Sequence, residues 1–250
     1  MSRPNGPARV GLASGRLFFW FMPSSSVAIL LFTRSAGEEA AHKQFLSYGG
    51  RAANAAVAAQ LIAHAAATAR RAGAGFIQID SSQQAGATFG ERLARAMRQA
   101  FEQGYEHLLV IGNDCPQLTA TLLRQAVAAV RQTGAVLGPA TDGGVYLLGL
   151  SRARFATGTW AGLPWQTRQL GTALRRHLLA QGAAVLRLPT LADVDTEADL
   201  ARAITLPLVG WLQRRLRQLR ARRRVASGLV GPVLRRRARA AQPHRGPPAC

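Results

Sequence analysis

The sequence contains only two cysteines, Cys115 and Cys250, and no long apolar run. Two cysteines exclude a disulfide framework and argue against a Cys-based zinc site. No apolar stretch reaches the roughly 18 to 20 residues that a membrane-spanning helix needs. The 250 residues are 48% hydrophobic and 18% charged, which excludes a disordered or collagen-like chain. We therefore expect one globular domain with appendages, or at most two small domains.

Lysine is also scarce, and the acidic residues end early. Lys43 is the only lysine among 32 basic residues, and no acidic residue follows Asp199. Residues 201–250 carry 13 arginines, so most of the net charge of +20 lies in the tail and the rest of the chain is mildly basic. Charge that is concentrated in a tail is a weaker sign of nucleic-acid binding than charge on a folded face. We expect no specific nucleic-acid partner.

The first 25 residues show no regular pattern and are predicted to form an N-terminal extension. The apolar stretch at 17–22 is shorter than the roughly 7 to 15 residues of a secretory signal core. We predict a cytoplasmic protein, and Met22 is an alternative start of translation that an intact-mass measurement would identify.

From residue 26 onward, short apolar segments alternate with amphipathic ones. Strands are predicted at 27–32, 75–80, 107–111, 135–137, 145–150 and 185–188, and helices at 52–71, 90–103, 119–131, 167–181 and after Thr196. This alternation is typical of a mostly parallel sheet with helices on both faces. Ligands of such sheets bind at the carboxyl ends of the strands.

Polar residues follow the first predicted strand. Thr33, Arg34 and Ser35 come directly after it, and Lys43 lies eight residues after Ser35. Hydroxyl, guanidinium and ammonium groups of this kind can bind phosphate. Ser35 followed by Glu38 also has the spacing of a helix capping box, and both roles can hold at once.

Acidic residues follow three further strands. Asn113 and Asp114 come after the strand at 107–111, and a carboxylate there suits Mg²⁺ or Mn²⁺, although a turn aspartate is the alternative. Asp142-Gly-Gly separates two apolar strands and predicts a tight turn, with glycines that also permit close approach of a ligand. Asp193 and Asp195 share one side of an extended segment, where Asp195 is either a second metal ligand or a helix cap.

Three segments in order resemble the DUF2064 family. They are Gly-Asn-Asp-Cys-Pro-Gln-Leu at 112–118, Gly-Pro-Ala-Thr-Asp-Gly-Gly-Val-Tyr-Leu-Leu-Gly at 138–149, and Asp-Val-Asp-Thr at 193–196 followed by Asp-Leu at 199–200. Thr-Phe-Gly-Glu-Arg-Leu at 88–93 also resembles the family's segment before its second helix. The resemblance covers roughly residues 27–204. The family belongs to the nucleotide-diphospho-sugar transferase superfamily, which has a GT-A-like, Rossmann-like fold.

The resemblance implies a single GT-A-like transferase domain over residues 26–205 that binds a nucleotide-sugar and a small-molecule acceptor. It implies Mg²⁺ or Mn²⁺ held by Asp114 with help from Asp195, and an Asp142-Gly-Gly segment that faces the acceptor or sugar side. If the reaction inverts the sugar carbon, we expect Asp142 to be the catalytic base. The resemblance also implies a set of nucleotide- or substrate-binding residues: Thr33, Arg34, Ser35, Lys43, Gly86, Arg92, Asn113, Gly143 and Gly144. Trp165 and Pro189 either shape the acceptor pocket or are packing residues.

One departure from the family pattern bears on the reaction. Many relatives carry several lysines after the first strand, whereas this chain has only Lys43 there. We therefore favour glycosyl transfer from a diphospho-sugar. A nucleotidyltransferase acting on a small phosphorylated or alcohol substrate, and a non-catalytic nucleotide-binding module, remain the alternatives.

The C-terminal region is predicted to form two parts. Leucines at 208, 212, 216 and 219 give residues 206–224 an apolar stripe opposite a face of arginines, which predicts a basic amphipathic helix. Such a helix either packs on the domain or contacts the inner face of an anionic membrane. Residues 225–250 are rich in arginine and proline and are predicted to be disordered.

Overall fold

A six-stranded sheet lies at the centre of the chain, in the order β2-β1-β3-β5-β4-β6. The computed structural model describes residues 25–228, with side chains up to residue 221. The strands are β1 (Val27–Phe32), β2 (Gly75–Ile79), β3 (His107–Ile111), β4 (Gly134–Pro139), β5 (Val145–Ser151) and β6 (Ala184–Arg187). The helices are α1 (Ala36–His42), α2 (Gly50–Arg70), α3 (Phe89–Glu102), α4 (Ala120–Thr133), α5 (Arg152–Thr157), α6 (Leu170–Ala180), α7 (Glu197–Ala203) and α8 (Gly210–Gly228).

Five of the six strands run in the same direction. β5 is antiparallel to both β3 and β4, and the other pairings are parallel. The reversal of β5 follows from the tight turn at 140–144, which joins β4 to β5 as a hairpin. The carboxyl ends of β1, β2, β3, β4 and β6 therefore meet at one edge, and the predicted mostly parallel α/β fold is confirmed.

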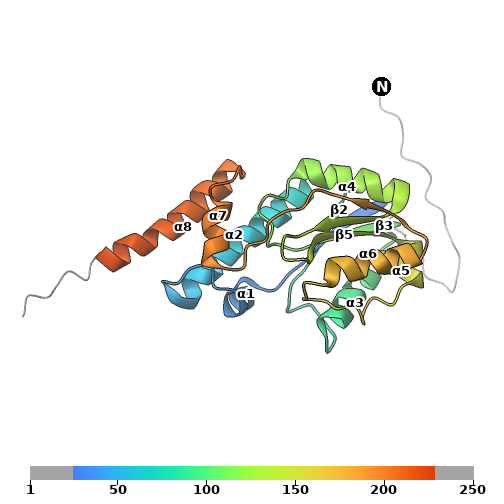
Figure 1. Cartoon of the computed structure of the whole chain (residues 1–250), viewed down its shortest axis with the longest axis horizontal. Coiled ribbons are helices and arrows are strands. Elements are labelled where there is room, and N and C mark those ends of the chain that lie inside the picture. The colour runs from blue at the N-terminus through green and yellow to red at the C-terminus, as the bar shows by residue number, and fades with distance from the viewer. Residues whose placement is uncertain (1–24, 229–250) are drawn as a thin grey trace, which may run out of the picture.

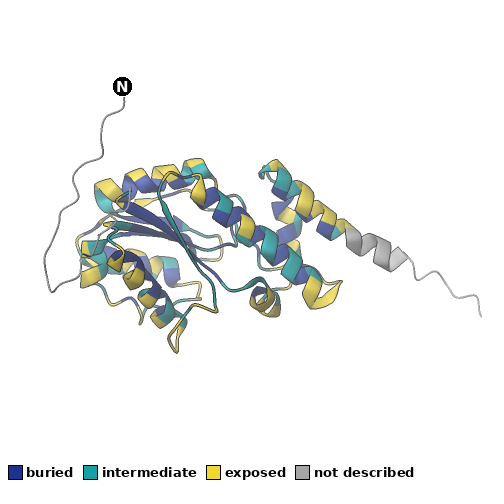
Figure 2. Cartoon of the chain, turned by 180° about the vertical axis from the view of Figure 1, so that it is seen from behind, coloured by how far each residue is buried: buried dark blue, intermediate teal, exposed yellow. Residues whose placement is uncertain are grey.

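Helices cover both faces of the sheet, as Figure 1 shows with α4 on one side and α3 and α6 on the other. Alternate residues of β1 face the two layers, because side chains of a strand point to opposite faces. Val27, Ile29 and Leu31 pack in the cluster with α2 and α4, and the residues between them pack with α3 and α6. Burial on both faces explains the continuous apolar run of β1, which is dark blue in Figure 2.

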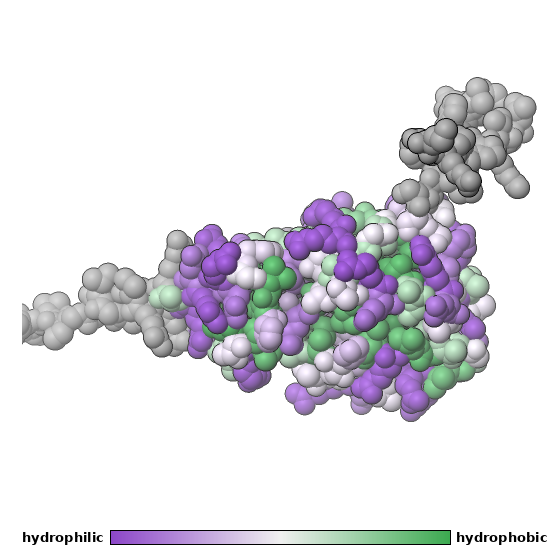
Figure 3. Space-filling model, turned by 90° about the horizontal axis from the view of Figure 1, so that it is seen from above, coloured by the Kyte–Doolittle hydropathy of each residue, from purple (hydrophilic) through white to green (hydrophobic). Residues whose placement is uncertain are grey.

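A third apolar cluster joins α2 to α7 and α8. Leu212, Leu216 and Leu219 of α8 are buried there, so the apolar stripe of the basic helix packs on the domain. Arg214 and Arg215 lie on the opposite, exposed face, and hydrophilic side chains cover much of this end of the molecule in Figure 3. Contact of this arginine face with an anionic membrane stays a prediction.

Several bounds differ from the predicted ones. α8 begins at Gly210 and ends at Gly228, whereas the predicted helix covers 206–224. The predicted extension, apart from Ser25, and the predicted tail beyond residue 228 lie outside the described residues. The short helix α5 has no amphipathic period long enough to predict it. None of the described helices is long and apolar enough to cross a membrane.

Gly149 in the middle of β5 tests the packing of the sheet against α4. A Cβ atom at this position would lie 2.8 Å from Leu109 Cδ2 and 3.1 Å from Val136 Cβ. We expect Gly149→Val to lower the free energy of unfolding by about 1–3 kcal/mol, because it overfills a closed core. Gly162→Ala, where a Cβ atom meets nothing within 4 Å, is the control. Equal urea midpoints for the two variants would contradict this packing.

His64 of α2 makes stability depend on pH. Its Nε2 lies 3.2 Å from the carbonyl oxygen of Leu118, and its ring lies beside Trp211 of α8. Burial lowers the pKa of His64 from its ordinary value of 6.5, and the backbone hydrogen bonds offset this only in part. The unfolded chain therefore binds a proton that the folded chain does not, so stability falls as pH drops below about 6.5.

His64→Gln removes this proton uptake. We expect the variant to lose less free energy of unfolding than the wild type between pH 7.5 and pH 5.5, measured by urea denaturation. Burial also lowers the pKa of His107, so part of the pH dependence of the free energy of unfolding remains in both proteins. If the free energy of unfolding of the variant changes with pH as much as that of the wild type, then His64 is protonated equally in the folded and unfolded states.

Candidate active site

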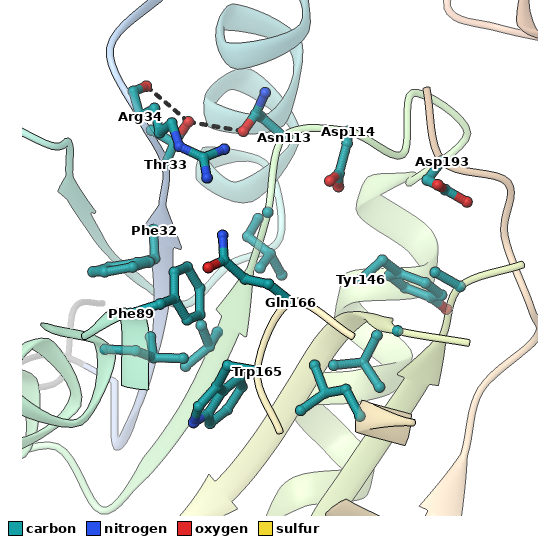
Figure 4. Close-up of a pocket in the computed structure, with 18 of the residues that line it drawn as sticks. Phe32, Thr33, Arg34, Phe89, Asn113, Asp114, Tyr146, Trp165, Gln166 and Asp193 are labelled. Carbon is teal, nitrogen blue, oxygen red and sulfur yellow. Dashed lines mark hydrogen bonds between the residues drawn. The ribbon is translucent and has the colours of Figure 1, made fainter. Parts of the chain in front are cut away.

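A pocket of about 810 Å³ lies at the edge of the sheet where the parallel strands end. Residues that follow β1 and β3, residues of the β4–β5 turn and the segment before α7 all line it. Figure 4 shows Arg34, Asn113, Asp114 and Asp193 along its polar side. The loops that carry polar residues in the sequence thus converge on one cavity of a size typical of ligand sites.

Lys43 connects the acidic residues of this pocket. Its Nζ lies 2.9 Å from Glu39 Oε1, 2.8 Å from Asp195 Oδ1 and 3.3 Å from Asp114 Oδ2. The three carboxylates come from α1, from the loop after β3 and from the segment before α7. One ammonium group therefore holds together three parts of the chain that are far apart in sequence.

The protonation of this cluster follows from its charges. Burial by itself lowers the pKa of Lys43, but Asp114, Glu39 and Asp195 outweigh it, so the pKa is raised and the side chain stays charged. Burial raises the pKa of Asp195, with Asp114 and Asp193 adding to the effect and Lys43 opposing it. Carboxylates are thus crowded here even though Lys43 lies among them.

Backbone contacts fix the segments that carry these side chains. The N–H of Val194 donates to the carbonyl of Asp114 at 2.9 Å, which places the 193–195 segment beside the loop after β3. Gln44, next to Lys43, forms an isolated parallel bridge with Thr196. The side chain of Glu39 is 3% exposed and also accepts from Arg34 at 3.3 Å. Backbone hydrogen bonds and the Arg34–Glu39 pair therefore hold the segments of this cluster in place.

Thr33 and Asn113 connect the ends of β1 and β3. The Thr33 hydroxyl donates to Asn113 Oδ1 at 2.8 Å, and the Thr33 carbonyl accepts from Gln84 Nε2 at 2.8 Å. Asn113 Nδ2 is buried and, among the described residues, has no hydrogen-bond partner. Asn113 thus lines the pocket with one amide hydrogen-bonding group left without a described partner.

The Asp-Gly-Gly turn forms the far rim. Asp142 Oδ1 accepts from the N–H of Gly144 at 2.8 Å, and Thr141 donates to Asp193 at 2.9 Å. Gly143 has φ of 91°, and any side chain there would collide with the carbonyl oxygen of Arg168. This turn therefore requires glycine at 143, and Asp142 remains exposed at the pocket edge.

The structure brings nine of the twelve predicted site residues to this pocket. They are Thr33, Arg34, Lys43, Arg92, Asn113, Asp114, Asp142, Gly144 and Asp195. Ser35 instead caps α1 by accepting from the N–H of Glu38, while Gly86 and Gly143 shape turns beside the pocket. The role of each residue in binding or catalysis stays a prediction.

Sequence reasoning missed Glu39. A Glu–Lys pair four residues apart on a helix is usually an exposed pair, so its spacing alone did not indicate a buried site. The thiol of Cys115 is buried, and burial followed by Asp114 and Asp193 raises its pKa, so it is not a thiolate nucleophile.

The donor set of the pocket fits a hard divalent ion. Within the described residues no three His, Cys, Asp or Glu side chains are already gathered as metal ligands. Six acidic side chains line the pocket (Glu38, Glu39, Asp114, Asp142, Asp193 and Asp195), against the cationic Arg34, Lys43 and Arg92. Asp114 and Asp195 each contact Lys43 through one oxygen, and the second oxygen of each carboxylate is the kind that Mg²⁺ or Mn²⁺ prefers.

Comparison with known proteins gives one matching family model and several similar solved structures. The family model described as "Uncharacterized protein conserved in bacteria (DUF2064)" matches residues 48–167. A search of curated proteins finds no match. The crystal structure of a candidate nucleotide-diphospho-sugar transferase from Desulfovibrio desulfuricans G20 is 23% identical, with a TM-score of 0.69 over 80% of this chain and 98% of that chain.

Two further solved structures are more distant. Rv0371c of Mycobacterium tuberculosis H37Rv in complex with manganese is 17% identical, with a TM-score of 0.40 over 70% of this chain and 96% of that chain. CMP:2-keto-3-deoxy-manno-octonic acid synthetase complexed with CTP is 12% identical, with a TM-score of 0.41 over 72% of this chain and 97% of that chain. The family match confirms that this chain resembles the DUF2064 family, and the Desulfovibrio structure confirms that it shares the fold of that candidate nucleotide-diphospho-sugar transferase.

Proposed function

We propose that the chain is a metal-dependent transferase that uses a nucleotide-diphospho-sugar donor to modify a small-molecule acceptor. The observation that carries this proposal is an acidic pocket in a chain whose net charge is +20. Six carboxylates outnumber the three cationic side chains of the pocket, so a diphosphate would be repelled unless a further cation bound there. A divalent ion on Asp114 and Asp195 supplies that cation.

The binding roles follow from the positions of the side chains. Asp114 and Asp195 would hold Mg²⁺ or Mn²⁺ through the oxygens that do not contact Lys43. Arg34, held by Glu39, reaches into the pocket in Figure 4 and can bind a phosphate oxygen. Asn113 and the backbone of Gly144 line the same cavity and can orient the substrate.

The transfer needs little covalent chemistry from the protein. A bound divalent ion would neutralise the charge that develops on the diphosphate leaving group. Asp142, which is exposed at the rim, would accept the proton of an acceptor hydroxyl if the reaction inverts the configuration at the sugar carbon. Lys43 is engaged by three carboxylates, which leaves the chain's one lysine little freedom to bind a triphosphate and disfavours nucleotidyl transfer.

Asp114→Asn tests the metal assignment. We expect the variant to fold but to lose Mn²⁺-dependent binding of nucleoside diphosphate sugars by at least about tenfold, because an amide replaces a charged ligand of the ion. Calorimetric titration with UDP-, GDP-, ADP- and CMP-sugars, with and without Mn²⁺, measures this. Glu102→Gln, which removes one exposed acid of α3 outside the pocket, is the matched control.

The titration also distinguishes the alternatives. Full Mn²⁺-dependent affinity in Asp114→Asn would overturn the metal site. Preference of the wild type for CTP or GTP over every nucleotide-sugar would favour a nucleotidyltransferase.

Lys43→Met tests the ammonium at the centre of the cluster. Without it, Asp114 and Asp195 lose the cation that contacts both of them and only Arg34 remains against Glu39, so we expect a lower melting temperature in EDTA. Mn²⁺ should then raise the melting temperature of Lys43→Met more than that of the wild type, because the ion replaces the lost charge. Arg98→Met, which removes an exposed positive charge from α3, is the control. Equal melting temperatures of Lys43→Met and wild type in EDTA would contradict this role.

A further inference from the structure

The side of the pocket opposite the carboxylates is aromatic. Phe32, Phe89 and Trp165 line it and are here called the aromatic wall. The rings of Phe32 and Phe89 meet edge to face with centroids 5.6 Å apart, and Phe89 and Trp165 are tilted at 5.8 Å. Figure 4 shows these rings on the side of the cavity away from Asp114 and Asp193. The pocket therefore has one polar and one apolar half.

Trp165 is fixed in place before any ligand binds. Its indole N–H donates to the carbonyl of Trp160 at 2.7 Å, so its only donor is already used. A Cβ atom at residue 90 would lie 2.6 Å from Trp165 Cδ1, so the absence of a side chain at Gly90 lets the indole lie against α3. A fixed indole whose polar group is satisfied offers a ligand an apolar surface at little cost in entropy.

Gln166 adds a polar group next to this surface. Its φ of 61° is the one positive value among the described non-glycine residues, and such backbone strain often occurs where a side chain must be aimed at a ligand. The side chain is exposed and lines the pocket, and Figure 4 shows its amide between Phe89 and Asn113. A carboxamide both donates and accepts hydrogen bonds, as neighbouring hydroxyls require.

Resting on the proposed function, we propose that the aromatic wall and Gln166 form the subsite for the sugar ring of the donor. A pyranose ring has an apolar face of C–H groups that packs on an aromatic surface, and hydroxyls around its edge that a carboxamide can bind. The polar half of the pocket holds the diphosphate, to which the donor sugar is directly bonded. Phe89 and Trp165 are tilted by 49° to each other, so they do not form a parallel slot for a flat nucleobase.

Trp165→Ala tests the subsite by comparing each nucleotide-sugar with its free nucleoside diphosphate. Calorimetric titration in Mn²⁺ with UDP, UDP-glucose, GDP, GDP-mannose, ADP and ADP-glucose should show that the sugar raises affinity in the wild type. We expect Trp165→Ala to bind each nucleotide-sugar about tenfold more weakly than the wild type does, while its affinity for the free nucleoside diphosphate is unchanged. Trp165→Phe should keep most of the affinity for each nucleotide-sugar.

Gln166→Gly is the second variant, because glycine adopts the left-handed backbone without strain and removes the side chain that carries the amide. This variant should lose part of the extra affinity that the sugar gives over the free nucleoside diphosphate, and it should remain as stable as the wild type. Leu179→Ala, which truncates an exposed residue outside the pocket, is the control.

The outcomes separate the inference from the proposed function. An equal loss of affinity for free diphosphate and nucleotide-sugar in Trp165→Ala would place the base on the wall and overturn the inference. Equal affinity of the wild type for both ligands would also overturn it, while nucleotide binding itself survives. Absence of any nucleotide binding to the wild type would overturn the proposed function and the inference with it.

Discussion

The arrangement of the pocket depends on one ammonium group among three carboxylates. Lys43 draws together α1, the loop after β3 and the segment before α7, and each of these would otherwise carry unbalanced charge into a partly buried site. Glu39, 3% exposed, pairs with both Lys43 and Arg34, so the Arg34 guanidinium is positioned by the same cluster. Removing a single partner would leave uncompensated charge, which is why the loops around the pocket form one electrostatic unit.

The charge of the pocket is opposite to that of the chain. Thirteen arginines lie in residues 201–250, and Arg214 and Arg215 of α8 are exposed on the side away from its buried leucine stripe. The pocket itself has twice as many acidic as cationic side chains. The basic composition therefore says little about the ligand, whereas the local surplus of carboxylates predicts that an anionic substrate enters together with a cation. Aromatic side chains complete the cavity, which is suited to a ligand with one charged and one apolar part.

Much of the fold and of the pocket can be predicted from the sequence. The other features depend on contacts between distant segments, which local sequence patterns do not indicate. Apolar runs marked β1 and β3 because both are buried on two faces, and Asp114 and Asp195 were expected together because the strands before them end at one edge. Glu39 was missed because its spacing from Lys43 resembles an ordinary exposed helix pair. The sequence names Trp165 only as a candidate for the acceptor pocket and does not indicate Phe89, because the two rings are brought together only by packing of the 158–169 loop on α3, which Gly90 permits. Ser35 and Gly86 were expected at the ligand because capping and turn residues have the same composition as phosphate-binding loops.

Anomalous diffraction from crystals grown with Mn²⁺ and a nucleoside diphosphate tests the central assignment most directly. A manganese peak within coordination distance of Asp114 and Asp195, about 2.0–2.3 Å, with the diphosphate beside it and Lys43 still among its carboxylates, is the expected result. A bound nucleotide with no manganese at Asp114, or a manganese ion outside this pocket, would contradict it.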